Sequence, residues 1–148
     1  MTPLSRPLLS ATLLLTCAVL ATTTAPASAA TMPAGPASAS GYSTTYDACM
    51  DANSTTAGMV ECTGAETRRQ DERLNANYQA GIKTLNAQQR TALRDVQRLW
   101  IQFRDADCAL EHGLTGGSID RINAQTCVLQ ATKARADSLA VRFLPQDR

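Results

Sequence analysis

Residues 97–108 have the sequence Gln97-Arg98-Leu99-Trp100-Ile101-Gln102-Phe103-Arg104-Asp105-Ala106-Asp107-Cys108 and include the only tryptophan of the 148-residue chain. At 3.6 residues per turn, one face of a helix here carries Leu93, Gln97, Trp100, Arg104 and Cys108, with Phe103 beside it. We expect this helix to bury both aromatic side chains. Burying Gln97 and Arg104 as well is costly unless both are hydrogen-bonded, so we expect their partners elsewhere in the chain.

Two more helices are expected around this one. The first covers about residues 55–85, and Asn86 with the following Ala-Gln-Gln makes the turn into the helix over about 88–111. Three glycines then end that helix, and Thr115 or Ser118 can cap a third. Short connections make neighbouring helices antiparallel. With few aromatic residues and no alternating strand pattern, we predict an all-α fold, an antiparallel three-helix bundle with a short, disulfide-tied N-terminal segment.

The positions of polar residues relative to the turn at residue 86 suggest a polar core between the first two helices. Asp71 lies 15 residues before the turn at residue 86 and Arg104 lies 18 residues after it. The mismatch is about 4.5 Å of helix rise, which an arginine side chain can bridge. We therefore predict that Arg104 pairs with Asp71, while Gln97 and Asn75 satisfy nearby polar groups.

A catalytic role for these polar residues is the competing interpretation. The domain offers no serine–histidine–acid motif, no metal-ligand spacing and no glycine-rich phosphate loop followed by a lysine. We expect no catalytic residue, no enzymatic activity and no cofactor.

The N-terminus has the order of an export signal. Arg6 precedes an apolar run over 8–20, and Ala27-Ser28-Ala29 is a small-x-small cleavage site, so residues 1–30 are predicted to be a signal peptide. The run is too short to span a bilayer. A lipoprotein would carry its lipid on Cys17, but Thr16 stands where such signals have glycine or alanine, and we expect no lipid anchor there.

After the signal come a linker and one domain. Residues 31–45 are uncharged and rich in Ala, Pro and Ser, which predicts a disordered linker. Residues 46–144 are enough for one helical domain. Without Arg6 the exported chain has 13 basic and 13 acidic residues, so a nucleic acid or a membrane surface is not its expected partner.

The charges are sorted along the chain. No lysine or arginine occurs in 46–66 or in 105–120, whereas 67–104 contains eight basic residues. In an antiparallel bundle the two acidic segments lie at the same end, which we call the acidic end. Its residues are Asp47, Asp51, Glu61, Glu66, Asp105, Asp107, Glu111 and Asp120.

Four cysteines remain in the exported chain, which in this compartment predicts two disulfides. We favour Cys49 with Cys62 and Cys108 with Cys127, because each pair closes a short loop across a helix junction. Cys62 with Cys108 is the alternative, since these two lie at nearly the same level. A zinc site would lack any Cys-x-x-Cys pair and has one histidine to draw on, so we expect no metal.

The chain resembles a family of small secreted bacterial domains named after the LprI-type lysozyme inhibitor. The resemblance runs from about Tyr46 to about Leu139. It rests on Cys62, on the segments 70–78, 97–108 and 116–119, and on Cys127, Thr132 and Arg135. It implies a periplasmic or secreted helical protein whose partner is lysozyme, a cell-wall glycoside hydrolase, inhibited by protein contact. The alternative is an envelope structural or assembly module without a lysozyme target.

Two features point to a partner-binding surface. Asp105, Asp107 and Glu111 stand at a helix C-terminus, where negative charge opposes the helix dipole, as expected if they serve a partner; solubility is the competing explanation. The loop 111–118 lies within the favoured Cys108–Cys127 bridge. Its His112, Thr115 and Ser118 could hydrogen-bond the two carboxylates of a lysozyme cleft, unless the loop only connects two helices.

Overall fold

Residues 40–145 are described by a computed structural model, and the signal peptide expected at 1–30 lies outside them. Within this range the chain forms four α-helices, a short 3-10 helix and no extended sheet. The helices are α1 (Thr44–Ala52), α2 (Thr56–Thr84), α3 (Ala87–Ala109), η1 (Leu110–Gly113) and α4 (Ile119–Phe143). The all-α fold class is confirmed, and a fourth helix, α1, replaces the short N-terminal segment.

The helix ends have local causes. The Thr55 side chain accepts a hydrogen bond from the Gly58 amide at the start of α2. At the start of α3, Asn86 and Gln89 form a reciprocal capping box, with bonds of 2.9 and 3.0 Å. The sharp turn predicted at Asn86 therefore exists and is held by side chains.

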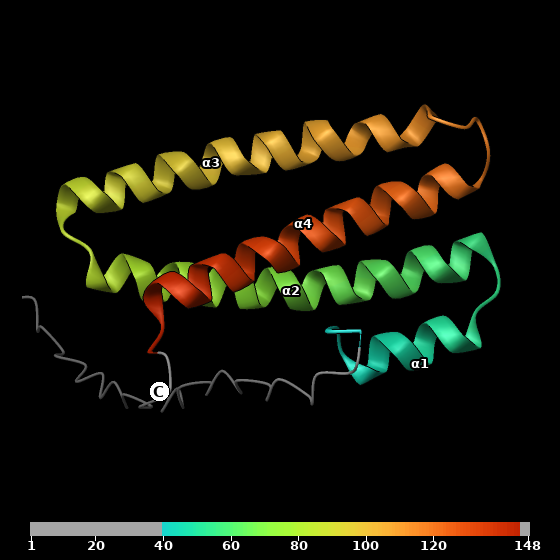
Figure 1. Cartoon of the computed structure of the whole chain (residues 1–148), viewed down its shortest axis with the longest axis horizontal. Helices are drawn as coiled ribbons and strands as arrows, with labels where there is room; N and C mark the ends of the chain where they lie inside the picture. Colours follow the sequence, from blue (N-terminus) through green and yellow to red (C-terminus); the bar gives the residue numbers. More distant parts are fainter. Residues whose placement is uncertain (1–39, 146–148) are drawn as a thin grey trace, which may run out of the picture. The chain divides into compact units, whose positions relative to one another are not determined.

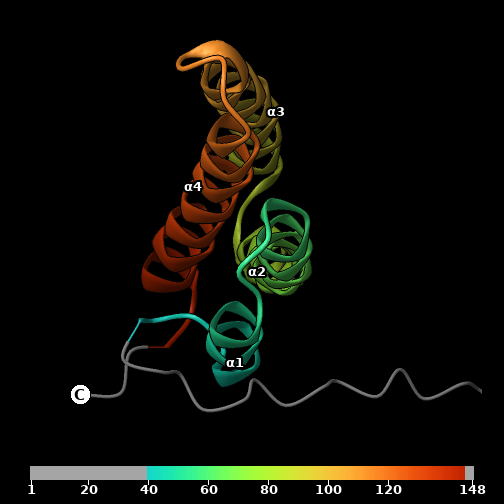
Figure 2. The ribbon, with the colours of Figure 1, turned by 90° about the vertical axis from the view of Figure 1, so that its right-hand side faces the viewer.

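The core lies mainly between α2 and α4. Helix α4 contacts α2, α3 and η1, while α1 contacts α2; Figures 1 and 2 show α4 beside both α2 and α3. The buried cluster comprises Leu74, Leu93, Ala136 and Leu139. A buried Asn77 amide also donates to the Ala136 carbonyl at 2.9 Å. Both apolar packing and a satisfied polar contact thus join α2 to α4.

Gly81 allows the end of α4 to approach α2. A Cβ atom at Gly81 would collide with the ring of Phe143. Because the ring occupies that space, a side chain at position 81 would force the Phe143 ring to move.

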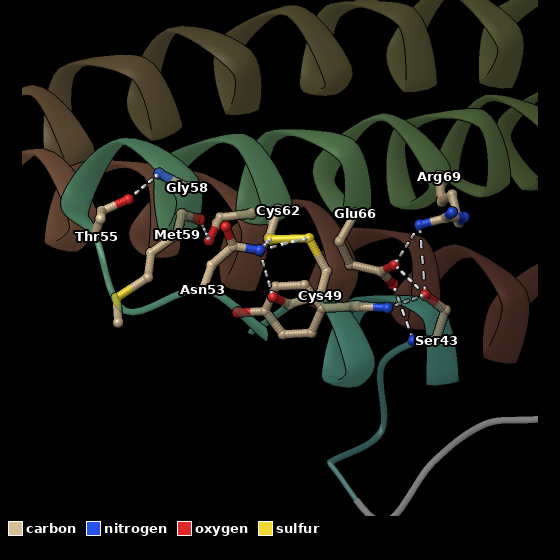
Figure 3. Close-up of a disulfide and its surroundings, with 11 residues drawn as sticks. Ser43, Cys49, Asn53, Thr55, Gly58, Met59, Cys62, Glu66 and Arg69 are labelled. Atoms are coloured by element: carbon tan, nitrogen blue, oxygen red, sulfur yellow. Dashed lines mark hydrogen bonds and ion pairs between the residues drawn. A yellow bond between two sulfur atoms is a disulfide. The ribbon is translucent and has the colours of Figure 1, made fainter. Parts of the chain in front are cut away.

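The N-terminal helix is tied to α2 in two places, which Figure 3 shows. One tie is the Cys49–Cys62 disulfide. The other is the fully buried carboxylate of Glu66, which accepts from the Ser43 hydroxyl (2.6 Å) and amide (3.2 Å) and from the side chains of Arg69 and Gln70 (3.1 and 2.7 Å). A buried carboxylate needs such a set of donors.

Two expectations change here. The linker predicted at 31–45 lies mostly outside the described residues, but Ser43 caps α1 and α1 begins at Thr44, so the folded part starts before residue 46. Glu66 does not belong to the exposed acidic end, because its carboxylate is buried and hydrogen-bonded.

Candidate functional site

Gln97 and Arg104, the polar residues expected on the inner face of residues 97–108, have hydrogen-bond partners on α4. Arg135 donates through Nε to the Gln97 side-chain oxygen at 3.0 Å, and Arg104 donates through Nη1 to the Thr132 hydroxyl at 3.3 Å. The Trp100 ring lies near both guanidinium groups, whose carbons are 5.1 Å (Arg104) and 5.7 Å (Arg135) from its centroid. We call these five residues the tryptophan seam. It joins α3 to α4 by cation–π contacts and hydrogen bonds.

The predicted pairing of Arg104 with Asp71 is wrong. Arg104 instead forms an ion pair with its neighbour Asp105, with 2.7 Å between Nη2 and Oδ1. Asp71 and Asn75 are exposed and hydrogen-bond each other at 3.1 Å, so they are not part of a polar core. The level argument assumed that α3 faces α2, whereas the polar face of α3 lies against α4.

Arg135 is the most constrained charge of the seam. Burial, and then the positive charge of Arg142, lowers the pKa of Arg135 below its ordinary value. Its Nη2 atom is buried without a hydrogen-bond partner among residues 40–145. Hydrogen bonds do not fully compensate the burial of the Arg135 guanidinium, and the cation–π contact with Trp100 offsets part of this desolvation cost.

A hollow of about 300 Å³ separates α2 from α3. Asp71, Asn75, Gln97 and Arg104, the four residues predicted to form the polar core, line its walls together with Tyr78, Trp100, Arg94 and Arg98. These side chains surround an open space rather than closing it.

The acidic end is smaller than the sequence suggests. Figure 1 shows the α1–α2 and the α3–η1–α4 connections at the same end of the long helices. Asp107 and His112 are exposed and Glu111 is half-buried, whereas Asp105 is engaged by Arg104. Asp107 and Glu111 are thus the acidic side chains of the α3 end that are most available to a partner.

The loop before α4 is ordered by Asp120, a residue that the sequence placed only among the acidic ones. Its buried carboxylate accepts from the Thr115 hydroxyl at 2.7 Å and from the Gly116 amide at 2.9 Å. The Thr115 hydroxyl bond, ahead of the other contacts, lowers the pKa of Asp120. Ser118 occupies the N-cap position of α4 without a side-chain capping bond. The sequence contains a signal for this contact, because Asp120 stands in the first turn of a helix and five residues after Thr115.

Phe103 is not a core residue, contrary to expectation. Its exposed fraction is 65%, and Val96, Leu99 and Leu110 are exposed by 48%, 64% and 68%. Val96, Leu99 and Phe103 lie on a different side of α3 from Gln97 and Arg104, and Leu110 continues this side into η1. Helix α3 therefore carries an uncovered apolar surface in addition to the acidic end.

Both disulfides match the favoured pairing, with Cys49 bonded to Cys62 and Cys108 bonded to Cys127. Ligand atoms of Asp107, Cys108 and Cys127 lie within 4.8 Å of one another. Since the two sulfur atoms are bonded to each other, this group supplies no thiolate for a metal ion.

A family model described as "Lysozyme inhibitor LprI" matches residues 49–139. This chain belongs to the LprI family. The LprI match contains both disulfides and the whole tryptophan seam, so it covers the residues that hold α1, α3 and α4 in place. No curated protein and no solved structure matches the chain.

The LprI domain has no helix within residues 40–145 that is long and apolar enough to cross a membrane. Its predicted partner-binding residues differ in availability. Asp107 and His112 are free of the loop contacts described above, whereas Thr115 already bonds Asp120 and Asp105 already pairs with Arg104. The exposed apolar side of α3 was missed because periodicity identifies the buried face of a helix but not its width.

Proposed function

We propose that this LprI-family protein is exported to the periplasm or medium and inhibits lysozyme by direct protein contact, with no catalysis of its own. The observation that carries this proposal is the family match over residues 49–139. The signal sequence expected at 1–30 and the two disulfides support export, because disulfides persist in oxidising compartments. The antiparallel three-helix arrangement predicted from the short connections is part of the same proposal.

The proposed contact surface is the end of the molecule where α3 passes into η1 and the following loop. Asp107 and Glu111 attract a cationic hydrolase, and His112 stands beside them. Asp105, Thr115 and Ser118 complete the surface. The Thr115–Asp120 bonds and the Cys108–Cys127 bridge hold this region in shape, which lowers the ordering cost of binding.

The direct test uses the oxidised protein without residues 1–30. Cell-wall lysis by lysozymes of several structural classes is measured at increasing concentrations of the protein. We expect saturable inhibition of at least one class. Full lytic activity of every class at a large excess of folded, oxidised protein would contradict the proposal.

The contact surface is tested by charge reversal. Replacing both Asp107→Lys and Glu111→Lys should slow association with the inhibited lysozyme by about tenfold and change dissociation less, because exposed charges act mainly on encounter. Glu72→Lys, at an exposed acid of α2, is the matched control. Association rates that are unchanged in both variants and indifferent to salt would place the contact elsewhere.

A second candidate function is favoured by one observation, the apolar side of α3. An envelope assembly module without a lysozyme target would use such a surface to bind another protein. Absence of inhibition together with stable binding to an envelope component through Leu99 and Phe103 would favour this candidate.

A further inference from the structure

The apolar side of α3 has the spacing of a helix-pairing seam. The residues that form it follow one another at intervals of four, three, four, three and four: Ala92, Val96, Leu99, Phe103, Ala106 and Leu110, all of them exposed. We call this set the α3 stripe. Apolar residues in alternating steps of three and four define the seam by which two helices pack in a coiled coil. The stripe is thus suited to a second helix.

A hollow of about 270 Å³ opens beside the N-terminal half of the stripe. Ala92 and Val96 belong to both the stripe and this hollow, whose other apolar walls include Leu93 and Phe143. Arg142 also lines the hollow, and its side chain is exposed. The stripe therefore has a concave, mostly apolar half with a positive charge beside it.

The C-terminal half of the stripe is more exposed to solvent than the half beside the hollow. Leu110 at the end of the stripe and Leu114 just beyond it are exposed by about two thirds. Asp107 lies three residues before Leu110, about one helical turn away, and Glu111 follows Leu110 directly. One half of the stripe thus offers apolar side chains flanked by acids, and the other half offers a hollow with a base.

We propose that the α3 stripe binds a second copy of this chain, with the two α3 helices antiparallel. In that register Leu99 faces Phe103 of the second copy, Val96 faces Ala106, and Ala92 faces Leu110. Small residues meet larger ones at both ends of the seam, as close packing requires. In a parallel pair Ala92 would face Ala92 and Phe103 would face Phe103, which leaves gaps at one level and crowding at another.

The antiparallel register also fills the hollow. It brings Leu110 of each copy to the level of Ala92 in the other, where the hollow lies. Glu111 then comes close to Arg142 of the other copy, which gives an ion pair at each end of the seam. Shape and charge complementarity thus select the same orientation.

Self-association is measured by analytical ultracentrifugation of the oxidised protein over a wide concentration range. We expect a reversible monomer–dimer equilibrium. Phe103→Glu and Leu99→Glu should each raise the dissociation constant of the dimer by at least about tenfold, because a carboxylate would be buried at the centre of the contact between the two α3 stripes. Ala76→Glu, at an exposed position of α2, is the control and should dimerise like the parent.

Orientation is tested by a charge exchange. Glu111→Arg alone and Arg142→Glu alone should weaken the dimer, whereas the two substitutions in one chain should restore it. Within one copy Glu111 lies in η1, which precedes α4, and Arg142 lies in the last turn of α4, so roughly 35 Å of helix separates them and the rescue cannot be intramolecular. A parallel dimer would show no rescue.

The proposal is overturned if the chain stays monomeric at every concentration, if Phe103→Glu dimerises like the parent, or if the charge exchange fails to restore the dimer. Circular dichroism spectra and melting temperatures, measured beside each variant, establish that it folds. The experiments contain no lysozyme, and Phe103→Glu leaves Asp107 and Glu111 in place. Failure of this proposal is therefore distinguishable from failure of lysozyme inhibition.

Discussion

Helices α2 and α3 both pack on α4, but they do so differently. Helix α2 buries seven of its 29 residues and α3 only three of its 23. The α2–α4 contact combines apolar side chains with satisfied buried polar groups such as Asn77. The α3–α4 contact depends on Leu93, the tryptophan seam and the Cys108–Cys127 disulfide. The difference suggests that α2 and α4 form the stable unit and that α3 retains a face for a partner.

The largest expected difference between the two regions is in side-chain burial. Leu129 of α4 is completely buried, whereas Leu99 of α3 is 64% exposed. Leu129→Ala should lower the free energy of unfolding by about 3–5 kcal/mol, since it removes apolar contacts and leaves a cavity. Leu99→Ala should lower it by less than about 0.5 kcal/mol.

Both leucine variants are compared with the parent by urea unfolding at a concentration where the chain is monomeric. Equal losses in the two variants would mean that α3 is packed as tightly as α4. That result would also remove the basis for treating the α3 stripe as a surface open to a partner.

The next effect concerns the disulfide at the end of α3. Its two cysteines are 19 residues apart, and a loop of this size contributes about 3 kcal/mol through the unfolded state. Replacing both Cys108→Ser and Cys127→Ser should therefore destabilise the chain by about 2–4 kcal/mol. Because little else buries α3, its amides should lose protection from hydrogen exchange before those of α2.

Replacing both Cys49→Ser and Cys62→Ser provides the matched control, because this pair closes a loop of 13 residues and ties α1 instead. Its loss should expose the α1 amides and leave α3 protected. If α2 and α3 lost protection together in the Cys108/Cys127 variant, the two helices would belong to one cooperative unit.

The sequence predicts the helices and the disulfides well, because both depend on local information. The helices expected over about 55–85 and 88–111 are Thr56–Thr84 and Ala87–Ala109, and capping by Asn86 sets the boundary between them. Each disulfide joins cysteines across a helix junction, so short loops were a sufficient guide. The uninterrupted helical pattern and the turn residues carry this information directly.

The sequence fails where the answer depends on which helix is the neighbour. Periodicity places Arg104 on the inner face of α3, but Asp71 on α2 and Thr132 on α4 are both plausible partners until the packing is known. In the sequence Glu66 looks like an ordinary surface charge, because Ser43, which hydrogen-bonds its buried carboxylate, lies 23 residues away in the chain. The exposure of Phe103 likewise follows from how few residues α3 buries, which no local pattern encodes.

The smallest expected effect concerns the loop that joins η1 to α4. Hydrogen bonds from Thr115 and Gly116 stabilise the charged form of Asp120, and its pKa is lowered from the ordinary 3.8. The contribution of Asp120 to stability is therefore complete above about pH 4 and is lost as the pH falls through its lowered pKa in the folded protein. Acid should loosen residues 115–117 first, while the Cys108–Cys127 bridge still holds the end of α3 on α4.

Amide chemical shifts and hydrogen exchange of Thr115 and Gly116, followed as the pH is lowered, measure this loosening. In Asp120→Asn the same amides should already be less protected near neutral pH, and their protection should no longer fall with acid. Asp107→Asn, outside the Thr115–Asp120 contact, should keep the acid transition of the parent. If acid did not reduce the protection of Gly116 in the parent, or if Asp120→Asn lost protection with acid in the same way as the parent, then Asp120 would not be what orders the loop. The Cys108–Cys127 bridge would then hold this end of α3 on α4 without help from Asp120, whereas α2 has buried residues from Cys62 to Gly81.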